Sequence, residues 1–150
     1  GTHRERIEGL VQAGVDEGAT IAMGGGRGGF DTGFFVEPTL LVDCNNQMTP
    51  VREELFGPVV VVVPFDDDEE AIAIANDSDY GLAATVWTTN LSRTHRVAPQ
   101  LHVGIVWVNT WFSRDLRTPF GGTKLSGIGR EGGRWSLDFY SETTNICIKV

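Results

Sequence analysis

The chain has 150 residues, of which 41% are hydrophobic and 21% charged, and its formal net charge is -8. This composition is typical of a soluble globular protein with one ordinary core, and the negative charge excludes broad affinity for nucleic acid or acidic membranes. No apolar run approaches membrane-spanning length, and two cysteines are too few for a disulfide framework, which favours a reducing cytoplasm.

The first part of the chain alternates helical and extended patterns. Thr2 and Glu5 have the spacing of a capping box, and apolar residues then recur on one helical face until Gly18. We predict next a short strand at 20–23, a glycine-rich loop at 24–33 and an apolar stretch at 34–42. A helix is then predicted to begin at Thr49-Pro50, followed by a buried strand at 59–65.

The alternation continues beyond residue 65. Acidic residues 66–68 suit a helix N-terminus, and Asn90 can cap a helix that runs to about Gln100. Strands are predicted at 82–88 and 105–109. Strands that alternate with short helices indicate an α/β fold, with a parallel sheet and flanking helices.

The end of the chain has a different pattern. From residue 145 onward, Ile146, Ile148 and Val150 alternate with more polar residues. This period of two predicts a half-buried strand at 143–150.

Residues 53–58, Glu-Glu-Leu-Phe-Gly-Pro, combine an acid and an aromatic ring before a buried strand. The Glu54 carboxylate can accept two hydrogen bonds from a ribose diol, and the Phe56 ring can pack against a flat heterocycle. The chemistry fits a nucleotide-sugar contact. An exposed acid pair at a helix-to-strand corner fits the residues equally well.

Residues 111–117, Trp-Phe-Ser-Arg-Asp-Leu-Arg, are the candidate for substrate choice. Arg114 and Arg117 beside Trp111 and Phe112 can hold an anionic, conjugated substrate, because a guanidinium binds a carboxylate bidentately. In the alternative interpretation, each arginine pairs with Asp115 or another acid at the surface.

Two glycine runs, 24–29 and 127–132, satisfy the pattern Gly-x-Gly-x-x-Gly. A dinucleotide site needs a strand before the run and a helix that begins at the third glycine. The first run continues as loop and the second lacks the strand, although a helix can follow it. We interpret neither as a phosphate site.

The cysteines and histidines carry no catalytic or metal-binding pattern. Cys44 follows Asp43, whose charge raises a thiol pKa, and Cys147 lies among strand residues, so both are interpreted as small apolar fillers. The three histidines lack ligand spacing, and we expect no metal.

Four stretches resemble signatures of the NAD(P)-dependent aldehyde dehydrogenases, in the order of that family: 53–59, 76–84, 103–109 and 119–131. The last reads Pro-Phe-Gly-Gly-Thr-Lys-Leu-Ser-Gly-Ile-Gly-Arg-Glu. The resemblance implies that residues 1–142 are the C-terminal portion of the catalytic domain and that 143–150 form an oligomerisation strand of a homo-oligomer. It also assigns Glu54 to the nicotinamide ribose and Phe56 to packing on the NAD ring, with NADP not excluded.

Two family motifs are missing from this chain. The nucleophile lies in Gly-Gln-x-Cys and the general base in Glu-Leu-Gly-Gly, and neither occurs here. By resemblance, that cysteine attacks the aldehyde, hydride passes to the nicotinamide, and water hydrolyses the thioester. We therefore expect no catalytic residue in these 150 residues and no activity from them alone.

Residues 111–122, together with 126–133 and 139–142, most resemble the 2-hydroxymuconic semialdehyde dehydrogenases of meta-cleavage aromatic catabolism, and also the 2-aminomuconic enzymes. That resemblance places Arg114 on the substrate carboxylate, with Arg117 as second candidate. It places Trp111, Phe112 and Phe120 on the wall of the substrate funnel. The alternatives are a dehydrogenase of the betaine aldehyde type, or a non-catalytic module that binds a nucleotide or a partner subunit.

Overall fold

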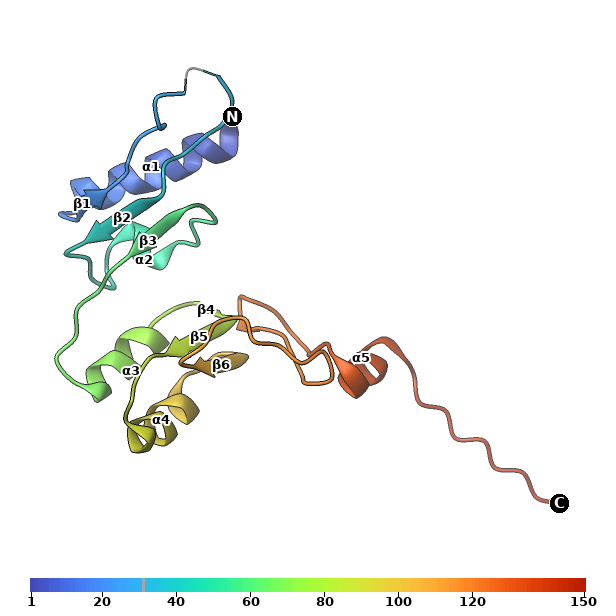
Figure 1. Cartoon of the computed structure of the whole chain (residues 1–150). Coiled ribbons are helices and arrows are strands. Elements are labelled where there is room, and N and C mark those ends of the chain that lie inside the picture. The colour runs from blue at the N-terminus through green and yellow to red at the C-terminus, as the bar shows by residue number, and fades with distance from the viewer. Residues whose placement is uncertain (31) are drawn as a thin grey trace. The chain divides into compact units, whose positions relative to one another are not determined.

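The computed structural model describes residues 1–30 and 32–150, which form two compact units, Gly1–Asp77 (unit 1) and Ser78–Val150 (unit 2) (Figure 1). Residue 31, in the predicted glycine-rich loop, lies outside the described residues. The predicted boundary between residues 142 and 143 lies within unit 2.

Unit 1 contains a three-stranded sheet in the order β1-β2-β3, with β1 antiparallel and β3 parallel to β2. Its elements are α1 (Thr2–Asp16), β1 (Thr20–Met23), β2 (Thr39–Val42), α2 (Thr49–Arg52), β3 (Val59–Val61) and α3 (Asp68–Asn76).

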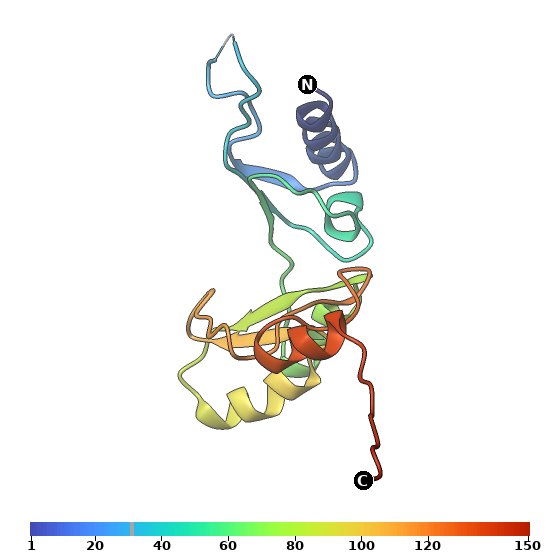
Figure 2. The ribbon, with the colours of Figure 1, turned by 90° about the vertical axis from the view of Figure 1, so that its right-hand side faces the viewer.

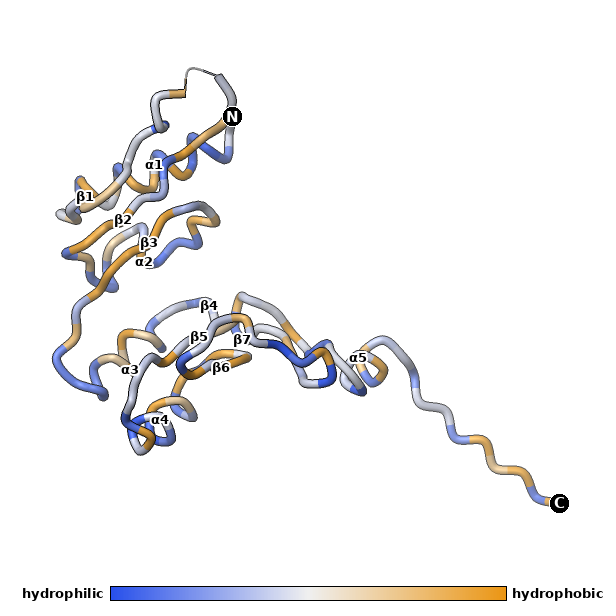
Figure 3. The backbone as a smooth tube through the Cα atoms, in the orientation of Figure 1, coloured by the Kyte–Doolittle hydropathy of each residue, from blue (hydrophilic) through white to orange (hydrophobic). Residues whose placement is uncertain are grey.

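The core of unit 1 lies between the sheet and two of its helices. Figure 2 shows α1 and α2 on the same side of the sheet. Leu41 of β2 is 0% exposed, and the other buried members of the cluster are Val11, Ala19, Cys44 and Met48. Figure 3 shows the hydrophobic character of β2 and β3. A Cβ added to Gly14 of α1 would lie 2.7 Å from Pro50 Cγ, so a glycine permits the close approach of α1 and α2.

Helix caps agree with the sequence at two of three positions. The predicted capping box at Thr2 and Glu5 is wrong, because Gly1 is the N-cap and its carbonyl accepts the Glu5 N–H at 3.1 Å. The Asp67 carboxylate accepts the Glu70 N–H at 2.8 Å and caps α3. The Asn90 side chain caps α4 (Leu91–Val97) in the same way.

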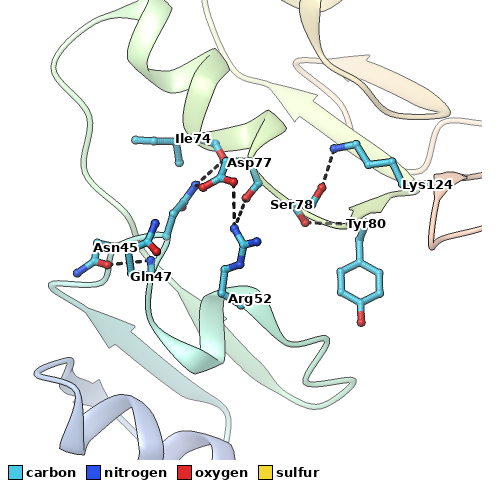
Figure 4. A network of polar contacts seen from close by, with 9 residues as sticks. Asn45, Gln47, Arg52, Ile74, Asp77, Ser78, Tyr80 and Lys124 are labelled. Atoms are coloured by element: carbon cyan, nitrogen blue, oxygen red, sulfur yellow. Dashed lines mark hydrogen bonds and ion pairs between the residues drawn. The ribbon is translucent and has the colours of Figure 1, made fainter.

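Side chains of α2 and the preceding turn bind the end of α3 (Figure 4). Arg52 Nη1 donates to both the carbonyl and the carboxylate of Asp77, at 3.2 and 3.0 Å, and Asn46 donates to the carbonyl of Ile74 at 2.9 Å. These contacts complete unit 1. In unit 2, Lys124 Nζ donates to the Ser78 carbonyl at 2.7 Å.

Unit 2 contains a parallel pair, β5 with β6, and an antiparallel pair, β4 with β7. Its elements are β4 (Tyr80–Gly81), β5 (Ala83–Val86), α4 (Leu91–Val97), the 3₁₀ helix η1 (Ala98–Gln100), β6 (Ile105–Val108), β7 (Thr123–Lys124) and α5 (Gly133–Tyr140). Together α4 and η1 match the predicted helix that ends at about Gln100.

Several predicted strands differ from the structure. The strand at 59–65 is shorter, since β3 ends at Val61, although the Val62 N–H still donates to the Leu41 carbonyl at 2.9 Å. The expected continuous parallel sheet is replaced by three small sheets within the described residues, two of which contain antiparallel pairing.

Residues 141–150 contain no helix or strand, and their side chains are exposed. The predicted strand at 143–150 is therefore absent from the described chain, because an extended segment becomes a strand only when a neighbour completes its backbone hydrogen bonds. Among the described residues, the helices are all too short or too polar to cross a membrane.

Candidate functional site

Residues 53–58, which we call the acid–ring loop, connect α2 to β3 without belonging to either. Side chains of α1 bind three consecutive backbone carbonyls in this loop. Arg6 Nη1 donates to the Glu54 and Leu55 carbonyls at 2.9 and 3.2 Å, and His3 Nε2 donates to the Phe56 carbonyl at 2.8 Å. The loop is thus held through its backbone by the first two turns of one helix.

The side chains of the two predicted cofactor residues are left accessible. Phe56 is 77% exposed and has a φ of 52°, a left-handed conformation that is uncommon for a bulky residue. Glu54 is exposed, and its carboxylate has no hydrogen-bond or ion-pair partner among the described residues. An acid and a ring that are free to bind a ligand therefore lie two residues apart.

A cavity of about 490 Å³ opens beside this loop. Phe56, Gly57 and Pro58 form one wall, and His3 and Ile7 of α1 contribute to its lining, which is completed by Gly1, Arg4, Phe34, Phe35 and Val36. The lining is predominantly apolar, which suits a flat ring more than a charged group.

In unit 2, an aromatic cluster lies just after β6. Trp107 is buried in β6, and its Nε1–H donates to the Ser113 carbonyl at 2.8 Å. The rings of Trp111 and Phe112 stack with centroids 5.1 Å apart, and both contact Trp107. Trp111 is nevertheless 69% exposed. The two predicted aromatic residues therefore present ring surface outward from a buried anchor.

Arg114 contacts an aromatic ring and an acid. Its guanidinium lies 3.9 Å from the centroid of the Phe120 ring, and Nη2 is 3.0 Å from the Glu131 carboxylate. Phe120 and Glu131 exchange backbone hydrogen bonds of 2.8 and 2.7 Å, which places both beside the arginine. The structure thus brings the predicted residues Arg114 and Phe120 together, with Glu131 as the partner that sequence reasoning did not identify.

Arg117 pairs with Asp115, as in the alternative interpretation of this stretch. Its Nε and Nη2 donate to the Asp115 carboxylate at distances between 2.6 and 3.1 Å, while the arginine side chain stays 88% exposed. This bidentate contact holds the pKa of Asp115 below its usual value. We call residues 109–118, which carry Arg114 and Arg117, the arginine loop.

The second glycine run precedes α5, and two backbone N–H groups at the start of this helix already have acceptors. The Gly132 N–H donates to the Ser136 hydroxyl at 2.7 Å, and the Gly133 N–H donates to the Leu116 carbonyl at 3.0 Å. These two donors are therefore occupied within the chain. Among the described residues between the first run, 24–29, and β2, there is no helix.

The two cysteines have different environments. Cys44 is buried, and burial together with the nearby Asp43 charge raises the pKa of its thiol. Cys147 is exposed, so its interpretation as an apolar filler is wrong in the described chain. No cluster of three or more metal-ligating side chains occurs at positions 1–30 and 32–150.

The order of the four motifs, the α/β units and the exposed pair Glu54 and Phe56 all agree with one class of protein, the aldehyde dehydrogenases. The model of the aldehyde dehydrogenase family matches residues 1–146, and the chain belongs to that family. It is 55% identical to a 2-aminomuconic 6-semialdehyde dehydrogenase from Pseudomonas sp, and 54% identical to a 2-hydroxymuconic semialdehyde dehydrogenase from Pseudomonas sp. (strain CF600). Each match covers 99% of this chain and 31% of the relative, so the chain spans about a third of the length of these relatives.

Solved structures confirm the α/β aldehyde dehydrogenase fold. A Mycobacterium tuberculosis aldehyde dehydrogenase complexed with NAD+ matches with a TM-score of 0.89 and 46% identity, over 94% of this chain and 29% of that chain. A Staphylococcus aureus betaine aldehyde dehydrogenase in complex with NAD+ matches with a TM-score of 0.88 and 45% identity, over 93% of this chain and 28% of that chain.

Proposed function

We propose that these residues belong to an NAD-dependent aldehyde dehydrogenase that oxidises an aldehyde to a carboxylic acid. In this proposal residues 1–142 are the C-terminal portion of the catalytic domain, and 143–150 are the oligomerisation strand of a homo-oligomer. Support comes from the family match over residues 1–146 and from the absence of both Gly-Gln-x-Cys and Glu-Leu-Gly-Gly. The nucleophile and the general base then lie in other parts of the protein.

The carrying observation is the accessible pair Glu54 and Phe56. A carboxylate that has no partner among the described residues can accept both hydroxyl protons of a ribose, and an exposed ring can pack against the nicotinamide. The residues therefore fit NAD, which accepts a hydride when it is bound. This chain's contribution is to orient the reactive end of the cofactor, and orientation lowers the barrier by fixing the reacting geometry.

The Glu54→Gln variant of the full-length enzyme tests this assignment. The amide keeps the size of the side chain but loses the charge and one acceptor oxygen, so we expect single-turnover hydride transfer to slow about tenfold while the melting temperature stays within about 1 °C. Glu69→Gln, an exposed change in α3, is the control and leaves both unchanged. Unaltered hydride transfer in Glu54→Gln contradicts the assignment.

For the substrate we propose a semialdehyde that also carries a carboxylate, such as 2-hydroxymuconic or 2-aminomuconic semialdehyde. Arg114 lies against Phe120, so a conjugated acid could contact the guanidinium and an aromatic surface together. The muconic semialdehyde relatives are 51–55% identical to this chain when bacterial, against 45–46% for betaine aldehyde dehydrogenases. Arg117, bound by Asp115, is the second candidate for the carboxylate.

One observation favours betaine aldehyde as the alternative substrate. The exposed rings of Trp111 and Phe112 resemble the aromatic surfaces that bind quaternary ammonium groups. Arg114→Ala in the full-length enzyme tests the carboxylate role. We expect KM for a carboxylated semialdehyde to rise about tenfold, because a charge-assisted hydrogen bond is lost, and KM for a neutral aldehyde to stay unchanged. Equal changes for both substrates contradict the carboxylate role.

A further inference from the structure

In the described chain, the backbone carbonyls of residues 54–56 in the acid–ring loop are bound by side chains and not by other backbone groups. The carbonyls of 54, 55 and 56 accept hydrogen bonds from side chains of α1 that are about fifty residues earlier in the sequence. Arg6 bridges two of them with one nitrogen, and His3 binds the third. A backbone carbonyl can only accept, so His3 Nε2 must carry the hydrogen in this contact.

The donors form one face of α1. His3, Arg6 and Ile7 are spaced i, i+3 and i+4, so their side chains lie on the same side of the helix. Ile7 is buried, and a Cβ added to Gly57 would lie 2.5 Å from Ile7 Cδ1. The loop therefore rests directly on this face, with an apolar contact next to the polar ones.

The same face distinguishes the two adjacent acids. Arg6 Nη2 lies 3.6 Å from the Glu53 carboxylate, whereas the Glu54 carboxylate has no partner among the described residues. Glu53 thus neutralises the arginine that binds the loop, and Glu54 is left for a ligand. Phe56, with its left-handed φ of 52°, lies between the Leu55 carbonyl bound by Arg6 and the Gly57 contact with Ile7, and a bulky residue keeps this conformation only when its surroundings fix it.

We propose that Arg6 and His3 are positioning residues that set the place of the Glu54 carboxylate and the Phe56 ring for NAD, and that Glu53 is the structural acid of the pair. This inference rests on the proposed cofactor role of the loop. Neither α1 residue needs to touch the cofactor. Their effect passes through the backbone of 54–56, which distinguishes them from the residues that bind NAD directly.

The test uses full-length enzyme with Arg6→Met, which keeps an apolar stem but removes every donor. We expect the Kd for NAD+, measured by calorimetry, to rise roughly five- to tenfold, which corresponds to the loss of about one net hydrogen bond. Amide hydrogen exchange at residues 55–57 without NAD+ should accelerate by a similar factor. Arg6→Lys keeps one nitrogen for the carbonyls but loses the second nitrogen, Nη2, that faces Glu53, so it should give intermediate values.

The matched control is Arg27→Met. Arg27 forms two hydrogen bonds to Glu8 of the same helix, at 2.7 and 2.9 Å, and does not contact the acid–ring loop. The Arg27→Met variant removes another arginine–glutamate pair that involves α1, and it should change neither the Kd for NAD+ nor amide exchange at residues 55–57. His3→Gln retains an N–H donor and should bind NAD+ more tightly than His3→Leu.

A double-mutant cycle with Glu54→Gln separates the inference from the function on which it rests. If Arg6 acts through the loop, Arg6→Met should raise Kd much less in the Glu54→Gln background than in wild type. If Glu54→Gln weakens NAD+ binding but Arg6→Met behaves like Arg27→Met in Kd and exchange, the positioning role is overturned and the proposed function stands. If Glu54→Gln changes neither Kd nor hydride transfer, the proposed function is overturned, and the positioning role for NAD with it.

Discussion

The acid–ring loop of unit 1 and the arginine loop of unit 2 differ in whether the side chains predicted to bind a ligand already have partners within the protein. In the first, neighbouring side chains bind the backbone, and Glu54 keeps its carboxylate unpaired among the described residues. In the second, Arg114 and Arg117 are already bound to Glu131 and Asp115. A ligand can add to the first loop directly, whereas an anionic ligand in the second must compete with an internal acid.

The largest loss of stability is expected at Gly104 in unit 2, which lies just before β6 and packs against the backbone of Gly121. A Cβ added to Gly104 would overlap the Gly121 carbonyl oxygen, and a backbone atom cannot rotate away. Gly104→Ala should lower the free energy of unfolding by about 3 kcal/mol or more, measured by chemical denaturation. Gly9→Ala in α1, where nothing lies within 4 Å, should instead raise it by about 0.5–1 kcal/mol. Equal stability of the two variants would contradict this explanation.

A smaller change concerns the anchor of the arginine loop. Trp107→Phe removes the indole donor and leaves the Ser113 carbonyl without its 2.8 Å bond, which should cost about 1–2 kcal/mol of unfolding free energy. Trp87→Phe, at an exposed ring in the same unit, should stay within about 0.5 kcal/mol of wild type. Thermal melts of both variants compare them directly; similar losses would show that the indole hydrogen bond is unimportant.

The smallest effect is the titration of Asp115. Arg117 lowers the pKa of this carboxyl, so the ion pair is complete above the ordinary value near about 3.9 and breaks only as the pH falls through the lowered pKa. Asp115 should therefore titrate below the usual range when followed by carboxyl-carbon NMR. In Arg117→Gln its pKa should return upward. An unchanged midpoint would mean that the pair does not persist in solution.

Local signals predicted the helices better than the sheets. Asp67 and Asn90 are caps that act within three residues, and Pro50 fits the first turn of α2, so each could be inferred from its neighbours. The pairing of β4 with β7 joins two-residue strands more than forty positions apart, and no local pattern encodes it. Glu131 reaches Arg114 only because the backbone bridge between Phe120 and Glu131 folds residues 120–131 back on themselves, which sequence spacing does not reveal.

The candidate site was predictable in its residues but not in its contacts. The run 53–58 identifies Glu54 and Phe56 by chemistry and family resemblance, yet nothing in that run points to His3 or Arg6 as the donors that hold it. For Arg117, the sequence left substrate binding and pairing with Asp115 both open, and the structure contains the pair.

Because Cys44 is buried and Cys147 is exposed, a thiol reagent can label Cys147 selectively. The thiolate is the species that attacks a maleimide, and burial raises the pKa of Cys44 while Cys147 lies exposed within the last ten residues. At neutral pH a fluorescent maleimide should therefore react with Cys147 well before Cys44. A dye at that position would report whether the terminal segment becomes shielded in the proposed homo-oligomer.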